Sequence, residues 1–138
     1  HFSGFADEVG EGAGKGFNHN YPLPEGTEEK AYLQAVSKTM NRIKRHHPMV
    51  LVLSLGLDCL RGDPTGSFKV PVDVMVTIGT HLVDLNIPLL IVQEGGYSLR
   101  NLRRGPRMLF AAIAEALQRK DDLSPSGKRR RGEPKRDS

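Results

Sequence analysis

The sequence predicts an α/β fold in which helices pack against a mainly parallel sheet. Two short apolar runs, MVLVLSL at residues 49–55 and PLLIVQ at residues 88–93, are typical of strands that are buried on both faces. Segments with helical periodicity precede, separate and follow these runs, and this order implies a parallel sheet with helices packed on it. Because two strands are few for such a layer, we expect the sheet to continue in chain that this sequence does not contain.

Three segments carry apolar residues at helical spacing. The first spans residues 27–46, where Thr27 can cap the amino end. The third spans residues 106–119 and begins with a proline, a residue that suits the first position of a helix. The second lies between the two apolar runs, and its apolar positions are Val74, Ile78, Leu82 and Leu85.

The two ends of the chain differ in composition from its middle. Residues 1–26 are rich in glycine, which is typical of a loop, although residues 17–23 can form a short strand. Eight basic and four acidic side chains within residues 119–138 account for the whole formal charge of +4. We therefore expect a domain portion at residues 1–118 and a disordered basic tail at residues 119–138.

Composition also limits the class of protein. Hydrophobic residues make up 38% of the chain and charged residues 26%, as in ordinary globular domains. No apolar run approaches the roughly 20 residues that a membrane span requires. The single cysteine, Cys59, excludes an internal disulfide, and we expect an intracellular protein, cytoplasmic or nuclear. The first residue is His1 and not Met, so we expect the chain to be part of a longer protein.

Polar residues follow both predicted strands, at the edge where open parallel sheets bind ligands. Asp58 comes after the first strand and Tyr97 after the second, so both should lie at one edge. A carboxylate and a phenol there could serve a metal ion and a polarised carbonyl group. Position alone, however, favours a helix cap or a turn for Asp58, and a structural role for the Gly-Gly-Tyr turn.

Three segments in a fixed order give a more specific indication. They are GFADEVGEGAGKGFNHNYPLPEGT at residues 4–27, LGLDCLRGDPTGSF at residues 55–68 and VQEGGYSLRNL at residues 92–102. Together they resemble the histone deacetylase and acetylpolyamine amidohydrolase family, over roughly residues 1–117. The resemblance implies a three-layer α/β fold of the arginase/deacetylase type, of which this chain holds only the C-terminal portion.

The resemblance also implies roles for seven positions. Asp58 matches the last zinc ligand of the family, and Tyr97 matches the tyrosine that hydrogen-bonds the substrate carbonyl and its tetrahedral oxyanion. The other five are Gly95 and Gly96 around the acyl group, Phe2 on the aromatic wall of the lysine tunnel, Thr65 on the rim, where polyamine-selective relatives can carry glutamate, and Phe17, whose main-chain carbonyl matches a potassium site.

The reaction implied is zinc-dependent hydrolysis of an acetamide, in acetyl-lysine of a histone or another protein or in an acetylpolyamine. The family's histidine pair and Asp-x-His segment supply the general base and the other zinc ligands, and we expect both to precede residue 1, so this chain alone should be inactive. His46 and His47 do not fit that pair, because they end a helix at the opposite end of the strand from Asp58. His19 and His81 lack ligand-like spacing to Asp58.

Two other functions stay open at this point. The chain could be a truncated or degenerate homologue that serves as a non-catalytic interaction module, or an anchor for a basic tail that recruits nucleic acid or an acidic partner. The run Lys128–Arg131 could also be a nuclear-localisation signal, although such runs are more often solvated. The presence of both Asp58 and Tyr97 favours the enzyme, and we expect neither a membrane nor a nucleic acid as partner.

Overall fold

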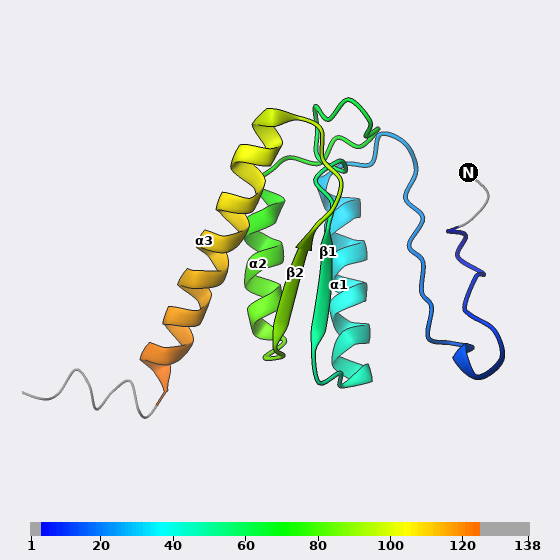
Figure 1. Cartoon of the computed structure of the whole chain (residues 1–138), viewed down its shortest axis with the longest axis horizontal. Coiled ribbons are helices and arrows are strands. Elements are labelled where there is room, and N and C mark those ends of the chain that lie inside the picture. Colours follow the sequence, from blue (N-terminus) through cyan, green and yellow to red (C-terminus); the bar gives the residue numbers. More distant parts are fainter. Residues whose placement is uncertain (1–3, 125–138) are drawn as a thin grey trace, which may run out of the picture.

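The computed structural model describes residues 4–124, which form helices beside a pair of parallel strands (Figure 1). Strands β1 and β2 pair in parallel, with Leu51 opposite Leu89 and Leu55 opposite Gln93. The predicted parallel sheet is therefore confirmed. No helix among the described residues is both long and apolar enough to cross a membrane. In chain order the elements are the 3-10 turn η1 (Gly12–Gly14), α1 (Glu29–His46), β1 (Leu51–Leu55), α2 (Val74–Asp84), β2 (Leu89–Gln93) and α3 (Leu99–Leu123).

Helix α1 begins and ends close to the predicted positions, but Thr27 does not cap it. The hydroxyl of Thr27 donates to the carbonyl oxygen of Pro24 at 2.6 Å, and Glu28 occupies the cap position without a side-chain hydrogen bond. At the other end, His47 adopts a left-handed conformation (φ 49°), which stops the helix before Pro48. Residues 17–23, a candidate strand, form no strand in the structure.

The core lies between one face of the strand pair and the helices. Helices α2 and α3 approach closely at Gly79, where a β-carbon would lie 2.8 Å from the carbonyl oxygen of Leu109. This close approach holds α3 against α2, so that the start of α3 reaches the carboxyl ends of the strands (Figure 1). The fully buried large side chains of this core are Leu57, Leu60, Val70, Val74, Met75 and Leu109.

Helix α3 is longer than the sequence predicts, because it starts at Leu99 and contains Pro106 in its interior. An interior proline removes a backbone hydrogen bond and typically costs about 3 kcal/mol. The start is fixed upstream instead: the Ser98 side chain accepts from the Asn101 amide at 3.4 Å, and the Asn101 side chain donates to the Arg61 carbonyl at 3.3 Å. The prediction that α3 begins at Pro106 is therefore wrong.

The far end of α3 also differs from the prediction. The helix continues to Leu123, so residues 119–123, assigned to a disordered tail, are helical. The rest of the predicted tail, with the run Lys128–Arg131, lies outside the described residues apart from Ser124.

Among residues 4–124 the strand pair is covered on one face only, although its apolar runs are typical of strands that are buried on both faces. Leu53 and Ile91 pack against the core, whereas Val52 and its partner Leu90 are 54% and 55% exposed. The physical reason is that no segment among residues 4–124 lies over that face. A run of apolar residues shows that a strand can be buried on both sides, but not that the covering layer belongs to the same sequence.

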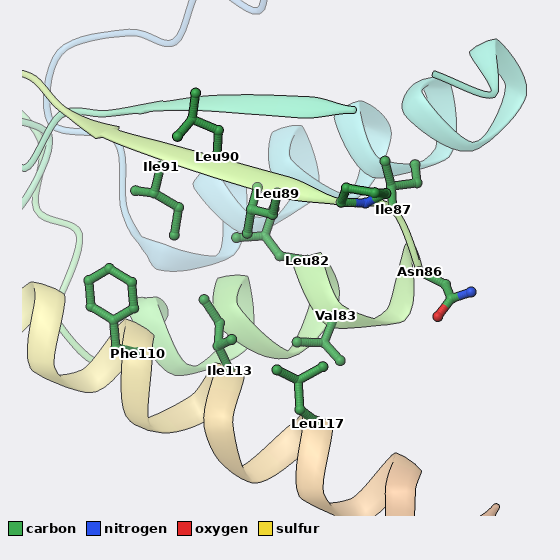
Figure 2. Close-up of a pocket in the computed structure, with 11 residues that line it drawn as sticks. Leu82, Val83, Asn86, Ile87, Leu89, Leu90, Ile91, Phe110, Ile113 and Leu117 are labelled. Carbon is green, nitrogen blue, oxygen red and sulfur yellow. The ribbon is translucent and has the colours of Figure 1, made fainter. Parts of the chain in front are cut away.

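An apolar groove runs between β2 and α3, with a volume of about 630 Å³. Figure 2 shows Ile91 of β2 and Phe110 of α3 facing each other across it, with Ile113 and Leu117 further along α3. Phe110 and Leu117 are more than half exposed. Leu90 also borders the groove, but its side chain points away from α3, toward the uncovered face of the strand pair (Figure 2).

We expect this chain on its own to bind a hydrophobic dye, because the groove and the uncovered strand face expose contiguous apolar side chains. Replacing Leu90 with lysine should lower the dye fluorescence, whereas Met49→Lys should not, since Met49 is exposed but lies outside the groove. A fluorescence titration of the two variants and the unchanged chain measures the difference. Absence of dye binding to the unchanged chain would contradict the prediction.

Candidate active site

The loops that follow β1 and β2 stay paired beyond the strands, at the upper end of the sheet in Figure 1. The amide of Glu94 donates to the carbonyl of Leu55 at 3.0 Å, and the amide of Leu57 donates to the carbonyl of Gly95 at 2.9 Å. This pairing carries the register of the strands into the loops. Asp58 and Tyr97 therefore lie at the same edge of the sheet, as the sequence predicts.

The carboxylate of Asp58 lies among glycines. A β-carbon at Gly56 would be 2.8 Å from its Oδ1 atom, and one at Gly95 would overlap its Oδ2 atom. Asp58 is half-buried, and among residues 4–124 no donor forms a hydrogen bond with its carboxylate. This side chain therefore neither caps a helix nor closes a turn. Its oxygens are free to bind a cation, and a carboxylate oxygen is a ligand that zinc accepts.

Gly95 and Gly96 are required by the local geometry. Gly95 makes room for the Asp58 carboxylate, as described above. Gly96 has φ +131°, a conformation that favours glycine, and a β-carbon there would lie 2.9 Å from the β-carbon of Leu57. The two glycines thus allow the loop after β2 to pass close to the loop after β1.

Asp63 connects the two loops, a role that the sequence did not suggest. It is buried (6% exposed), and its Oδ2 atom accepts from the backbone amides of Tyr97 at 2.7 Å and Ser98 at 3.0 Å. Its Oδ1 atom accepts from the amide of Thr65 at 3.0 Å and from the Thr65 hydroxyl at 2.8 Å. An Asp-Pro-Thr turn is a recognisable signal for the bonds to Thr65, but the distant partners have no local signal.

The surroundings of Asp63 favour its ionised form. Burial raises the pKa of this carboxyl, but the hydrogen bonds from Tyr97, Thr65 and Ser98 act in the opposite direction and prevail. They lower the pKa of Asp63 to about 2 from its ordinary value of 3.8. Asp63 is therefore an anion at neutral pH, and its charge is stabilised by donors from both loops.

Cys59, next to Asp58, ties the first loop to helix α1. Its sulfur lies 3.4 Å from the phenol oxygen of Tyr32 and donates to the carbonyl of Gly56 at 3.6 Å. Burial raises the pKa of the Cys59 thiol, and burial also raises the pKa of Tyr32. The thiol is thus protonated at neutral pH, which suits a packing role and not that of a nucleophile.

The four histidines among residues 4–124 lie apart from this edge. His46 and His47 are exposed at the end of α1, and His81 is exposed on α2. The Nε2 atom of His19 lies 2.7 Å from a guanidinium nitrogen of Arg42. Within residues 4–124 no three or more His, Cys, Asp or Glu side chains are grouped so that they could hold a metal ion. Asp58 fits a metal as one ligand and not as a complete site.

Comparison with known proteins identifies the family of this chain. The sequence model of the histone deacetylase domain matches residues 2–113, which is most of the chain. The chain belongs to the histone deacetylase domain family.

Relatives in this deacetylase family include enzymes named for two kinds of substrate. The acetylpolyamine amidohydrolase of Burkholderia pseudomallei is 40% identical over 111 residues, which cover 80% of this chain and 33% of that protein. Human histone deacetylase 1 is 31% identical over 107 residues, which cover 75% of this chain and 22% of that protein. The chain therefore spans a third or less of the length of these relatives.

Solved structures of deacetylase-family proteins share the fold. The crystal structure of the acetylpolyamine aminohydrolase from Burkholderia pseudomallei aligns with a TM-score of 0.80 at 37% identity, over 83% of this chain and 34% of that chain. The histone deacetylase Clr3 aligns with a TM-score of 0.76 at 24% identity, over 81% of this chain and 19% of that one, which shows likeness of fold alone. The predicted arginase/deacetylase-like α/β fold is thereby confirmed.

The other positions matched to the deacetylase family are not all at this edge. Tyr97 is 61% exposed, and Thr65 is exposed on the loop after β1. Phe17 is also exposed, and its ring meets that of His46 edge-on, with centroids 5.6 Å apart, near the amino end of β1. The structure therefore does not bring Phe17 close to Asp58. Phe2 lies outside the described residues. The roles assigned to these residues stay predictions.

We expect Asp63 to contribute to stability only while it is ionised. Because its pKa is lower in the folded chain than its ordinary value, this contribution is present above about pH 4 and is lost as the pH falls toward about 2. Urea midpoints measured at about pH 7 and about pH 3 should differ less for Asp63→Asn than for the unchanged chain. Asp84→Asn, which removes an exposed carboxylate, is the control and should leave the difference unchanged. An equal pH dependence in Asp63→Asn and the unchanged chain would contradict this assignment.

Proposed function

We propose that this chain forms the C-terminal part of a zinc-dependent deacetylase domain, called the parent domain below. The parent domain hydrolyses the acetamide of acetyl-lysine in a histone or another protein, or of an acetylpolyamine. The observation that carries the proposal is the free Asp58 carboxylate at the same sheet edge as Tyr97. The family membership and the names of the relatives support the reaction class.

Asp58 provides one ligand for the zinc ion, through a carboxylate that no other described group engages. Catalytic zinc sites use three protein ligands, so two more come from chain N-terminal to residue 1. Zinc held there would supply a water of near-neutral pKa and would polarise the acetamide carbonyl. The glycines on either side of Asp58 keep side chains away from this carboxylate and hold it at the sheet edge.

Tyr97 acts on the substrate oxygen. Its hydroxyl donates a hydrogen bond to the acetamide carbonyl, and this bond strengthens as negative charge develops on the oxygen. Tyr97 is largely exposed, so its side chain can reach a substrate without displacing the core. Gly95 and Gly96 leave space for the acyl group beside it, and Thr65 stands at the rim as a neutral residue.

The chain by itself should bind zinc weakly and should not hydrolyse an acetamide. A single carboxylate leaves at least two positions of a catalytic zinc ion without protein ligands. Isothermal calorimetry of zinc binding to the 138-residue chain, with Asp58→Asn as the control, measures this. Tight and stoichiometric uptake that Asp58→Asn abolishes would show that the chain contains a complete site, against the proposal.

In the parent domain, Asp58→Asn and Tyr97→Phe should fail in different ways. Asp58→Asn removes the charge of a metal ligand, so zinc content and activity should fall together. Tyr97→Phe removes only a donor to the oxyanion, so zinc should stay bound while kcat falls by about 10²–10³, or roughly 3–4 kcal/mol. Metal analysis and single-turnover rates on an acetyl-lysine peptide and on an acetylpolyamine measure both effects.

Two outcomes would overturn these roles. If Tyr97→Phe keeps nearly full activity, Tyr97 does not stabilise the oxyanion. If Asp58→Asn retains zinc as firmly as the unchanged domain, Asp58 is not a ligand. A parent domain that hydrolyses neither substrate in its unchanged form would favour the alternative, a homologue that serves as a non-catalytic interaction module.

A further inference from the structure

The position of Tyr97 depends on backbone contacts, because its side chain has few of its own. The ring is 61% exposed, and within residues 4–124 the phenol oxygen forms no hydrogen bond. The preceding residue, Gly96, has φ +131°. Glycine adopts this conformation readily, but it adopts others as readily, so Gly96 does not hold the turn in one conformation. Something outside this turn must therefore fix the direction in which the Tyr97 side chain leaves the backbone.

Asp63 is placed to do this. One oxygen of its buried carboxylate accepts from the amides of Tyr97 and Ser98, so the backbone is held on both sides of the Tyr97 α-carbon. Hydrogen bonds to an ionised acceptor are roughly twice as strong as neutral ones, and these measure 2.7 and 3.0 Å. The carboxylate also lies at the start of α3, where the helix dipole favours a negative charge.

The Asp63 side chain is also held on the side of its own loop. The second carboxylate oxygen accepts twice from Thr65, so the side chain of Asp63 cannot rotate without breaking bonds at both oxygens. Next to it, Asn101 of α3 donates to the carbonyl of Arg61, two residues before Asp63. The loop that carries Asp58 and the turn that carries Tyr97 are thereby joined through one rigid side chain.

We propose that Asp63 is a positioning residue for catalysis, which fixes the backbone at Tyr97 and so the place of its hydroxyl. The inference rests on the proposed function of Tyr97. Asp63 does not touch the substrate, and its effect on the rate passes through the tyrosine. Because the same carboxylate holds Thr65, the rim of the site and the oxyanion donor keep a fixed relation to each other.

A double-mutant cycle in the parent domain tests the inference. A displacement of about 1 Å can cost roughly 10²-fold in rate, so Asp63→Asn should lower kcat by about 10- to 100-fold while zinc stays bound. In the Tyr97→Phe background the same change should lower kcat by less than about threefold, because the hydroxyl to be positioned is already absent. Asp84→Asn, an exposed change on α2, is the control for loss of a carboxylate and should leave kcat unchanged. Measuring kcat at saturating substrate removes effects that act only on binding at the rim.

Amide hydrogen exchange in the 138-residue chain gives a second measurement, independent of activity. In Asp63→Asn the amides of Tyr97 and Ser98 should exchange at least tenfold faster, since an asparagine side chain cannot accept from all of the four donors. The amide of Leu57, which donates to Gly95, is the internal control and should keep its rate. Equal acceleration of all three amides would mean that Asp63 stabilises the whole fold and not the turn.

The outcomes separate this inference from the proposed function. If Tyr97→Phe lowers kcat but Asp63→Asn acts equally in both backgrounds, the positioning role is wrong and the role of Tyr97 stands. If Tyr97→Phe has no effect, both are wrong. Unchanged exchange at Tyr97 and Ser98 in Asp63→Asn would also overturn the inference, whatever the kinetics.

Discussion

The parallel pairing of β1 and β2 is the constraint on which the rest of this structure depends. Parallel strands end at the same edge, so the residues that follow them meet there, although Asp58 and Tyr97 are far apart in the sequence. The bond from the Leu57 amide to the Gly95 carbonyl extends this pairing past the strands and sets the two loops side by side. Helix α2 is the crossover that connects the two parallel strands. Its close packing with α3 at Gly79 places the start of α3 beside the loops.

Two kinds of contact then turn a shared edge into a defined site. Glycines at positions 56, 95 and 96 allow close approach, so that the Asp58 carboxylate lies between two backbone segments without a hydrogen bond to either. Asp63 supplies the opposite kind of contact, a buried carboxylate with every oxygen engaged. The two aspartates of this loop therefore differ in their capacity to bind a ligand. The Asp58 carboxylate can bind a cation, whereas both oxygens of Asp63 already accept hydrogen bonds.

The sequence predicts the strands, their parallel pairing and the shared edge, because apolar periodicity and the crossover rule depend on local patterns. It does not predict the start of α3, since Pro106 is a strong local signal for a helix start. The Ser98 cap is also a local signal, but the bond from Asn101 to the Arg61 carbonyl joins residues that are far apart in the sequence. The role of Asp63 is hidden for the same reason: its partners Tyr97 and Ser98 lie more than thirty residues away. Nor can the apolar runs show that one strand face is uncovered. Val52 and Leu90 are exposed, but they are apolar residues of the same types as those in buried strands.

The contact between Cys59 and Tyr32 also has a consequence for experiments on this fold. Cys59 is the one cysteine in the whole sequence, it follows Asp58 directly, and its thiol is half-buried against a phenol from α1. A thiol reagent can reach it fully only when the loop and the helix separate. The rate of alkylation therefore reports how often this corner of the molecule opens, without any label having to be engineered into the chain.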